Sequence, residues 1–249
     1  LPPRAPIWAW EKWLTATVLA MLVLCCLLPL AAVWLKAAAA GSSWAVLLEA
    51  QTWAAVWNTI RFSAAAVAAA TVLGVLYAAA ARQMAWLRAL MFLPFMVSPV
   101  CIAFGVLLLY PQWTASLWLL TATYALLAYP FVAKDVLAAW DGLPKDYVAA
   151  ARTMGANGFQ TACYVTAPLL KPALRRGLTL ASATCIGEFA ATLFLSRPEW
   201  QTLTTLIYDY LGRAGADNYG RAMVLTAVLT ALALAAFLLV DEAEGQKAV

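Results

Sequence analysis

Long apolar runs dominate this sequence and constrain its fold more than any other feature. Six of them reach about 20 residues, the length at which an α-helix crosses the hydrocarbon core of a bilayer. In chain order they cover approximately 13–35, 56–81, 87–110, 113–132, 174–195 and 219–240. Hydrophobic residues make up 65% of the 249 residues and charged residues only 11%, which excludes an ordinary soluble domain. The sequence therefore predicts an all-α fold, a polytopic membrane helix bundle of about six spans, with residues 1–249 as one transmembrane domain.

Basic residues are unevenly divided between the two sides of this predicted bundle. Of the 16 Lys and Arg residues, about eleven fall on the side that holds the amino terminus: Arg4, Lys12, Arg82, Arg88, Lys134, Lys145, Arg152, Lys171, Arg175, Arg176 and Lys247. The others fall on the opposite side: Lys36, Arg61, Arg197, Arg213 and Arg221. Since Lys and Arg are enriched in the cytoplasmic loops of membrane proteins, we expect both termini in the cytoplasm.

Several classes of function are disfavoured by what the sequence lacks. It has no histidine, the usual general base and the commonest metal ligand, and its five cysteines form no C-x-x-C pair. We therefore expect no metal and no cofactor. The net charge of +4 is dispersed, which predicts no nucleic-acid partner. There is no Walker A sequence, so the chain is not expected to bind ATP itself.

Two further classes are weaker alternatives to a transport subunit. An intramembrane enzyme would have to use Glu188 with Cys185 or Thr184, and no second acid in the same predicted span completes an acid and base pair. An ion-coupled transporter or channel would be expected to carry several ionisable residues inside the membrane. We therefore expect a subunit that is not an enzyme.

The longest predicted cytoplasmic segment, 133–176, is too polar to span and too patterned to be a loose loop. Pro144 suits a first helical turn, Asp146 adds negative charge near the positive end of a helix, and Gly155 or Gly158 can end it. These signals predict a short helix within 141–158. Its expected apolar face consists of Tyr147, Val148, Ala151 and Met154.

The spacing in this segment resembles a known family motif. Ala149-Ala150-Ala151, three residues, Gly155, nine residues, Val165, one residue and Ala167-Pro168 is similar to the E-A-A-x3-G-x9-I-x-L-P loop of binding-protein-dependent ABC importer permeases. Ala149 replaces the Glu of that motif, and Ala167 replaces the Leu.

The resemblance implies a permease of the MetI-like type in the bacterial inner membrane. Its cytoplasmic coupling helix, residues 141–158, would dock on a separate ABC ATPase dimer that hydrolyses ATP. The residues expected to couple are Asp146, Tyr147, Ala149, Ala150, Ala151, Gly155 and Pro168. An amphipathic helix resting on the membrane lipid is the alternative.

Other stretches narrow the resemblance to one branch. Asn58-Thr59-Ile60, Leu93-Pro94, Ser98-Pro99 and Gly187-Glu188-Phe189 resemble permeases for thiamine, ferric iron, sulfate and molybdate, and 196–213 most resembles those for thiamine and ferric iron. This implies thiamine or a thiamine phosphate as the solute, ferric iron next, and sulfate or molybdate after them. Two permease halves are often fused in that group. Because the sequence starts at Leu1 rather than Met, we expect the carboxy-terminal half, with its second half fused or separate.

Two candidate sites outside the loop have open interpretations. Glu188 is expected deep in a predicted span, where it would either attract a cationic solute or link helices through hydrogen bonds. Residues 199–213 are expected to form a short outer helix followed by a turn near Gly215. Trp200 and Tyr208 on this segment are candidates for contact with a periplasmic substrate-binding protein, although plugging the pathway or plain helix packing would also place them there.

Overall fold

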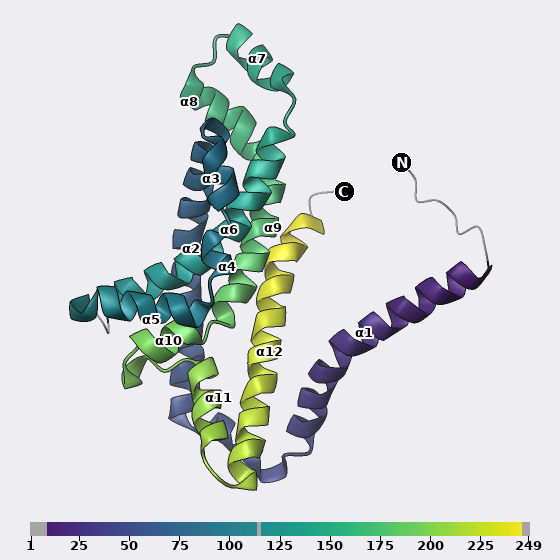
Figure 1. Cartoon of the computed structure of the whole chain (residues 1–249), viewed down its shortest axis with the longest axis vertical. Helices are drawn as coiled ribbons and strands as arrows, with labels where there is room; N and C mark the ends of the chain where they lie inside the picture. The colour runs from purple at the N-terminus through teal and green to yellow at the C-terminus, as the bar shows by residue number, and fades with distance from the viewer. Residues whose placement is uncertain (1–8, 114–115, 246–249) are drawn as a thin grey trace.

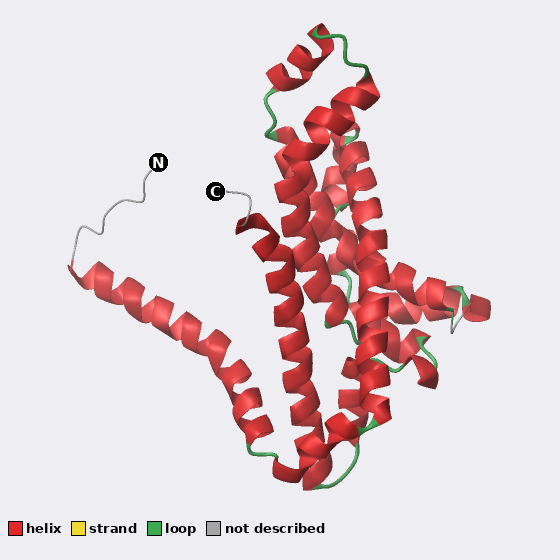
Figure 2. Cartoon of the chain, turned by 180° about the vertical axis from the view of Figure 1, so that it is seen from behind, coloured by secondary structure: helices red, strands yellow, loops and turns green. Residues whose placement is uncertain are grey.

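A computed structural model describes residues 9–113 and 116–245, and this part of the chain is helical with short connections (Figure 2). Arg4 and Lys247, counted above among the basic residues, lie outside it. The long helices are α1 (Ala9–Ala38), α2 (Ala50–Gln83), α6 (Leu117–Asp141), α9 (Ala167–Ile186) and α12 (Ala216–Gly245). Shorter α-helices are α3 (Ala85–Leu90), α4 (Leu93–Met96), α5 (Pro99–Leu109), α7 (Lys145–Thr153), α8 (Gly158–Thr161), α10 (Ala190–Leu195) and α11 (Leu203–Gly212). The 3-10 helices are η1 (Gly41–Leu48), η2 (Pro111–Trp113) and η4 (Pro198–Trp200), and η3 (Ala162–Thr166) is a short π-helix.

The described residues contain four helices that are long and apolar enough to cross a membrane: α1, α2, α6 and α12. The pair formed by α3–α4 and α5 passes the same test but is bent by 93°, so it gives a fifth span at most. Pro94 and Pro99 lie at this bend, as expected for residues that remove backbone donors from a helix. The all-α membrane bundle is confirmed.

The predicted number of spans, about six, is higher than this count. The predicted span 174–195 is divided between α9 and α10, with residues 187–189 outside both helices. Lys171, Arg175 and Arg176 all lie within the 20 residues of α9, so that helix is too charged to count as a membrane span by composition.

The core of the bundle is built around α6, which packs between α2 and α9 (Figure 1). Small residues let these backbones approach closely. A Cβ atom added at Gly74 would lie 2.7 Å from the Cβ of Val132, and one at Gly177 would lie 2.7 Å from the Cα of Val132. Both glycines therefore fit against the same turn of α6.

A second cluster of buried residues joins η1, α2, α11 and α12 at the opposite end of the molecule from α7 (Figure 1). Leu203, Leu206 and Tyr210 of α11 are buried there, whereas Leu211 is half exposed. Gly215 has a φ of +120°, in agreement with the predicted turn.

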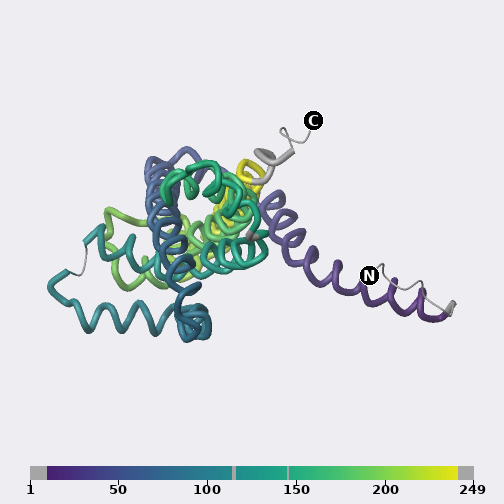
Figure 3. Tube along the Cα trace, turned by 90° about the horizontal axis from the view of Figure 1, so that it is seen from above, coloured from purple at the N-terminus to yellow at the C-terminus, as the bar shows by residue number. Residues whose placement is uncertain are grey.

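Helix α1 stands apart from this bundle. Seen from above, it extends outward, and it touches the rest of the molecule mainly near its carboxyl end (Figure 3). No residue in its most apolar stretch is buried. Most of this 30-residue helix, apart from its carboxyl end, is therefore left without protein neighbours.

Candidate functional site

The predicted cytoplasmic helix is present as α7, and it is ended by a defined cap. The N–H of Gly155 donates to the oxygen of Arg152 at 3.0 Å, and the N–H of Ala156 donates to that of Ala151 at 3.1 Å. These two bonds form a Schellman motif, which needs a left-handed residue, and Gly155 supplies it with a φ of +87°. The expectation that Gly155 ends the helix is thus confirmed in its geometry.

A second capped helix follows directly. Asn157 accepts a bond from the N–H of Gln160 at 2.8 Å, and the Gln160 side chain accepts from the N–H of Asn157 at 2.9 Å, which is a capping box. The chain then continues through η3 into α9. Pro168 lies in the first turn of α9, where a missing N–H costs little, and Pro172 lies inside that helix. Neither proline therefore ends a helix.

The tip of the loop carries exposed apolar side chains. Tyr147 is 54% exposed, Met154 83%, Phe159 78% and Tyr164 80%. Asp146, Ala149 and Ala150 are also exposed, whereas Ala151 is buried and Val148 is half-buried. The single apolar face predicted for this helix is therefore divided. Ala151 packs inward, and Tyr147 and Met154 face outward because the bundle offers them no neighbours.

The base of the loop is held by charged groups at the ends of α2, α3 and α6. Arg88 donates to both carboxylate oxygens of Asp141, at 2.7 and 3.3 Å. Arg82 lies 3.8 Å from the same carboxylate, and its guanidinium stands 4.7 Å from the ring centre of Trp140. Such bidentate pairs fix geometry as well as charge. The loop is therefore joined to the helices rather than loosely tethered.

Glu188 lies in the break between α9 and α10, and its side chain is 9% exposed in a buried setting. Its Oε1 accepts the N–H of Ala191 at 3.1 Å, so the carboxylate caps the start of α10. The backbone oxygen of Glu188 accepts bonds from the hydroxyls of Tyr124 and Thr204. Its contacts therefore join helices from three parts of the chain.

Thr184 and Cys185, the candidate catalytic partners of Glu188, make structural contacts instead. The hydroxyl of Thr184 donates to the backbone oxygen of Leu180 at 2.9 Å, within its own helix. Cys185 is buried in the core cluster. Thr184 and Cys185 therefore serve helix geometry and core packing.

Asn58 and Thr59 of α2, which belong to the family resemblance, form hydrogen bonds to the outer segment, residues 199–213. The side-chain amide of Asn58 donates to the backbone oxygens of Glu199 and Gln201, at 3.2 and 2.9 Å. The hydroxyl of Thr59 accepts the N–H of Leu203 at 2.9 Å. This anchoring explains why α11 has a fixed place against the bundle.

The two candidate docking residues of the outer segment differ in accessibility. Trp200 is partly buried, packs on the main core cluster, and has the guanidinium of Arg197 5.6 Å from its ring centre. Tyr208 is 53% exposed and packs its ring 5.2 Å from that of Phe189. Tyr208 is therefore available for a partner, and Trp200 largely serves packing.

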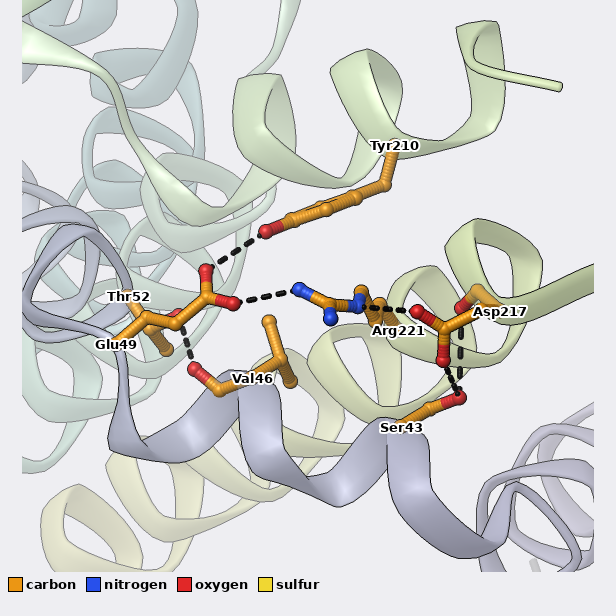
Figure 4. A network of polar contacts seen from close by, with 7 residues as sticks. All are labelled: Ser43, Val46, Glu49, Thr52, Tyr210, Asp217 and Arg221. Carbon is orange, nitrogen blue, oxygen red and sulfur yellow. Dashed lines mark hydrogen bonds and ion pairs between the residues drawn. The ribbon is translucent and has the colours of Figure 1, made fainter. Parts of the chain in front are cut away.

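The end of the molecule opposite α7 holds a polar network that the sequence did not predict (Figure 4). Arg221 pairs with Glu49 at 2.5 Å and with Asp217 at 2.8 Å. Tyr210 donates to Glu49 at 2.9 Å, and Ser43 donates to Asp217 at 2.8 Å. Burial raises the pKa of Tyr210, so its hydroxyl stays protonated and remains a donor. The network joins η1, α11 and α12.

No sequence pattern pointed to this network because its members are distant along the chain. Glu49 and Arg221 are separated by 172 residues. The available signal was that both are charged residues expected at the outer ends of apolar runs, where an ion pair between helix ends is favourable.

Comparisons place these features beside known proteins. Residues 70–241 match the family described as binding-protein-dependent transport system inner membrane component. A Salmonella typhimurium permease protein provisionally assigned to 2-aminoethylphosphonate transport is 27% identical over 196 residues, covering 75% of this chain and 73% of the relative. The sulfate transport system permease protein of Escherichia coli is 32% identical over 164 residues, covering 59% of this chain and 58% of the relative.

A solved structure shares the fold. One chain of a bacterial ABC transporter involved in the import of the acidic polysaccharide alginate superposes with a TM-score of 0.74 at 18% identity. The match covers 96% of this chain and 98% of that chain, so the helix arrangement is shared almost from end to end.

Proposed function

Because the chain belongs to the family of binding-protein-dependent transport system inner membrane components, the permeases of ABC importers, we propose that 141–158 is its coupling helix. In this role the segment docks on a separate cytoplasmic ATPase dimer and transmits its movement to the membrane helices. A coupling element must move as a rigid body with the spans that it drives. The Schellman cap at Gly155 and the Arg88–Asp141 pair supply that rigidity on the two sides of α7.

The observation that carries this proposal is the exposed apolar tip of a firmly held loop. Tyr147, Met154, Phe159 and Tyr164 are all more than half exposed. Helix α7 lies at one end of the molecule, beyond the bundle (Figure 1). Exposed apolar groups that gather at one place mark an interaction site. A protein cleft suits this tip better than a bilayer surface, because the positive charge of α7 is modest, with Lys145 and Arg152 offset by Asp146, and its face is made largely of small alanines.

The test is retention of the ATPase during purification of the membrane complex. Met154→Asp places a charge at the tip of the loop. Leu48→Asp is the matched control, because Leu48 is 88% exposed, like Met154 at 83%, but lies in η1, at the opposite end of the molecule from α7. We expect Met154→Asp to weaken ATPase association about tenfold and Leu48→Asp to leave it unchanged. Equal association in both variants would remove the docking assignment.

A second permease half, fused or separate, is the partner that best fits α1. The long middle part of this helix is apolar, and it has no buried residue in its most apolar stretch because it stands away from its own bundle (Figure 3). Packing against a second bundle would give its side chains close contacts that lipid alone does not provide. Both termini are proposed to be cytoplasmic, on the same side as α7, from the distribution of basic residues.

At the opposite end, Tyr208 is the better of the two candidates for docking a periplasmic substrate-binding protein. It is exposed on α11, which the Asn58 and Thr59 bonds hold in place. A rigid, exposed aromatic residue is typical of protein interfaces.

A small oxyanion is the proposed solute. The two relatives described above are named for 2-aminoethylphosphonate, which carries an anionic phosphonate beside a cationic amine, and for sulfate, so both solutes contain an oxyanion group. The sequence expectation, thiamine or a thiamine phosphate followed by ferric iron, came from the resemblance of 196–213, and Glu188 was a separate candidate for attracting a cationic solute. That carboxylate instead caps α10 through Ala191, which weakens the argument for a cationic solute. Molybdate belongs with sulfate in this proposal, and thiamine and ferric iron become the competing solutes of the uptake experiment.

A further inference from the structure

A cavity of about 580 Å³ lies beneath the coupling helix, between α7, α8 and the cytoplasmic ends of α2 and α6. Its volume is within the range of small-ligand sites, about 300 to 1,000 Å³. Its lining includes two arginines, Arg82 and Arg152, together with Trp140, Val148 and Ala149. Among the lining residues that the structure describes there is no carboxylate.

The acidic groups around this cavity do not fully balance the positive charge of its arginines. Asp141 is the acidic group beside Arg82, at 3.8 Å, but its carboxylate is already engaged by both Nη atoms of Arg88. One negative charge therefore serves two guanidiniums. The side chain of Arg152 has no hydrogen bond, ion pair or ring contact with another residue that the structure describes. Two guanidiniums that line the same open cavity are a common means of holding a phosphate or a similar oxyanion.

The depth of the cavity matches that of lipid phosphates. Arg82 stands in the last turn of α2 and Trp140 in the last turn of α6, and both helices are candidate spans. Tryptophan and basic residues at the end of a span lie at the level of the headgroups. Basic pockets between helices on the cytoplasmic side bind anionic headgroups.

Ala149 gives this site a distinctive feature. In the family motif quoted above this position is Glu, and in this chain its side chain is a methyl group on the cavity wall. A carboxylate at this position would place a negative charge close to Arg152 and Arg82. The replacement therefore leaves the cavity positive and open.

The geometry points to a binding site for one phosphate-type anion between the coupling helix and the bundle, with Arg82 and Arg152 as its ligands. The anion is either the headgroup of an anionic lipid or free inorganic phosphate. Its place beside α7 lets occupancy bias the position of the coupling helix. The site is independent of the transported solute, and its test does not require transport.

The test uses the complete transporter with its partner subunits in nanodiscs. In phosphatidylcholine discs, binding of radiolabelled inorganic phosphate is measured directly. In parallel, the complex is purified from membranes that contain phosphatidylglycerol, and retained lipid is counted by native mass spectrometry. The variants are Arg152→Gln and Ala149→Glu, both at exposed positions, so that neither should unfold the chain. Arg213→Gln, at the outer end, removes the same charge as a control.

Each source of the anion predicts its own result. Saturable phosphate binding that is about tenfold or more weaker in Arg152→Gln and Ala149→Glu, and unchanged in Arg213→Gln, assigns the site to free phosphate. Retained phosphatidylglycerol that is lost in the same two variants, without phosphate binding, assigns it to lipid. The inference is overturned when neither ligand distinguishes wild type from Arg152→Gln and Ala149→Glu.

Discussion

Replacing Gly177 by alanine tests the close contact between α6 and α9, the helices that precede and follow the coupling loop. Gly177 lies on α9 where it crosses α6, and the new Cβ would lie 2.7 Å from the Cα of Val132 and 3.2 Å from the oxygen of Phe131. Carbon atoms pack at about 3.5 to 4.0 Å, so the helices must move apart by about 1 Å. Overpacking of this kind costs about 1 to 3 kcal/mol.

The matched control is Gly105→Ala in α5, where a Cβ would meet nothing within 4 Å. Both substitutions gain about 1 kcal/mol from the higher helix propensity of alanine. Their difference therefore isolates the clash at α6, about 1 to 3 kcal/mol. For a chain of this length we expect Gly177→Ala to unfold about 2 to 12 °C below Gly105→Ala.

Thermal unfolding of the purified chain in one detergent, at one scan rate, measures this difference. Purified Gly105→Ala should be as stable as wild type or slightly more stable. Equal unfolding temperatures for the two variants would refute the close α6–α9 packing, and with it the rigid connection between the bundle and the loop. Uptake by Gly177→Ala, measured at equal membrane abundance, should fall with the loss of stability.

Three further predictions follow from single contacts. Glu188→Ala removes the cap on the N–H of Ala191 and should cost about 1 kcal/mol in thermal unfolding, whereas Glu188→Gln, which keeps an acceptor, should cost less. Equal stability of the two variants would contradict the capping role. Arg221→Ala should lower the unfolding temperature by an amount that shrinks at high salt, since the pairs that it breaks are partly exposed; a deficit that is insensitive to salt would argue against an ionic network. Asn157→Ala should speed amide hydrogen exchange at Gln160 without changing exchange in α6, and unchanged exchange would remove the capping box.

The parts of the fold that the sequence predicted are those determined by local chemistry. Gly155 ends α7 because a left-handed residue is required there, and the turn at Gly215 has the same cause. Asn58 and Thr59 were noticed as a motif, but their function as anchors of the outer segment became visible only in space.

The parts that were missed depend on contacts between distant segments. Apolar length alone could not show that α3–α4 and α5 are bent by 93°, since a proline in a helix can give a mild kink or a full break. Nor could it show that Glu188 falls between two helices rather than inside one. The Glu49–Arg221 pair needed the three-dimensional arrangement, since 172 residues separate its members.

The measurement that tests the central claim most directly is solute uptake by proteoliposomes that contain the complete transporter. Labelled sulfate, molybdate, 2-aminoethylphosphonate, thiamine and ferric iron are each supplied with the substrate-binding protein, with and without ATP inside. The variant is Gly155→Pro, because proline cannot adopt the φ of +87° that the cap requires. We predict ATP-dependent uptake of an oxyanion by wild type, and its loss in Gly155→Pro although the ATPase remains bound. Uptake without the ATPase, or undiminished uptake by Gly155→Pro, would contradict the account.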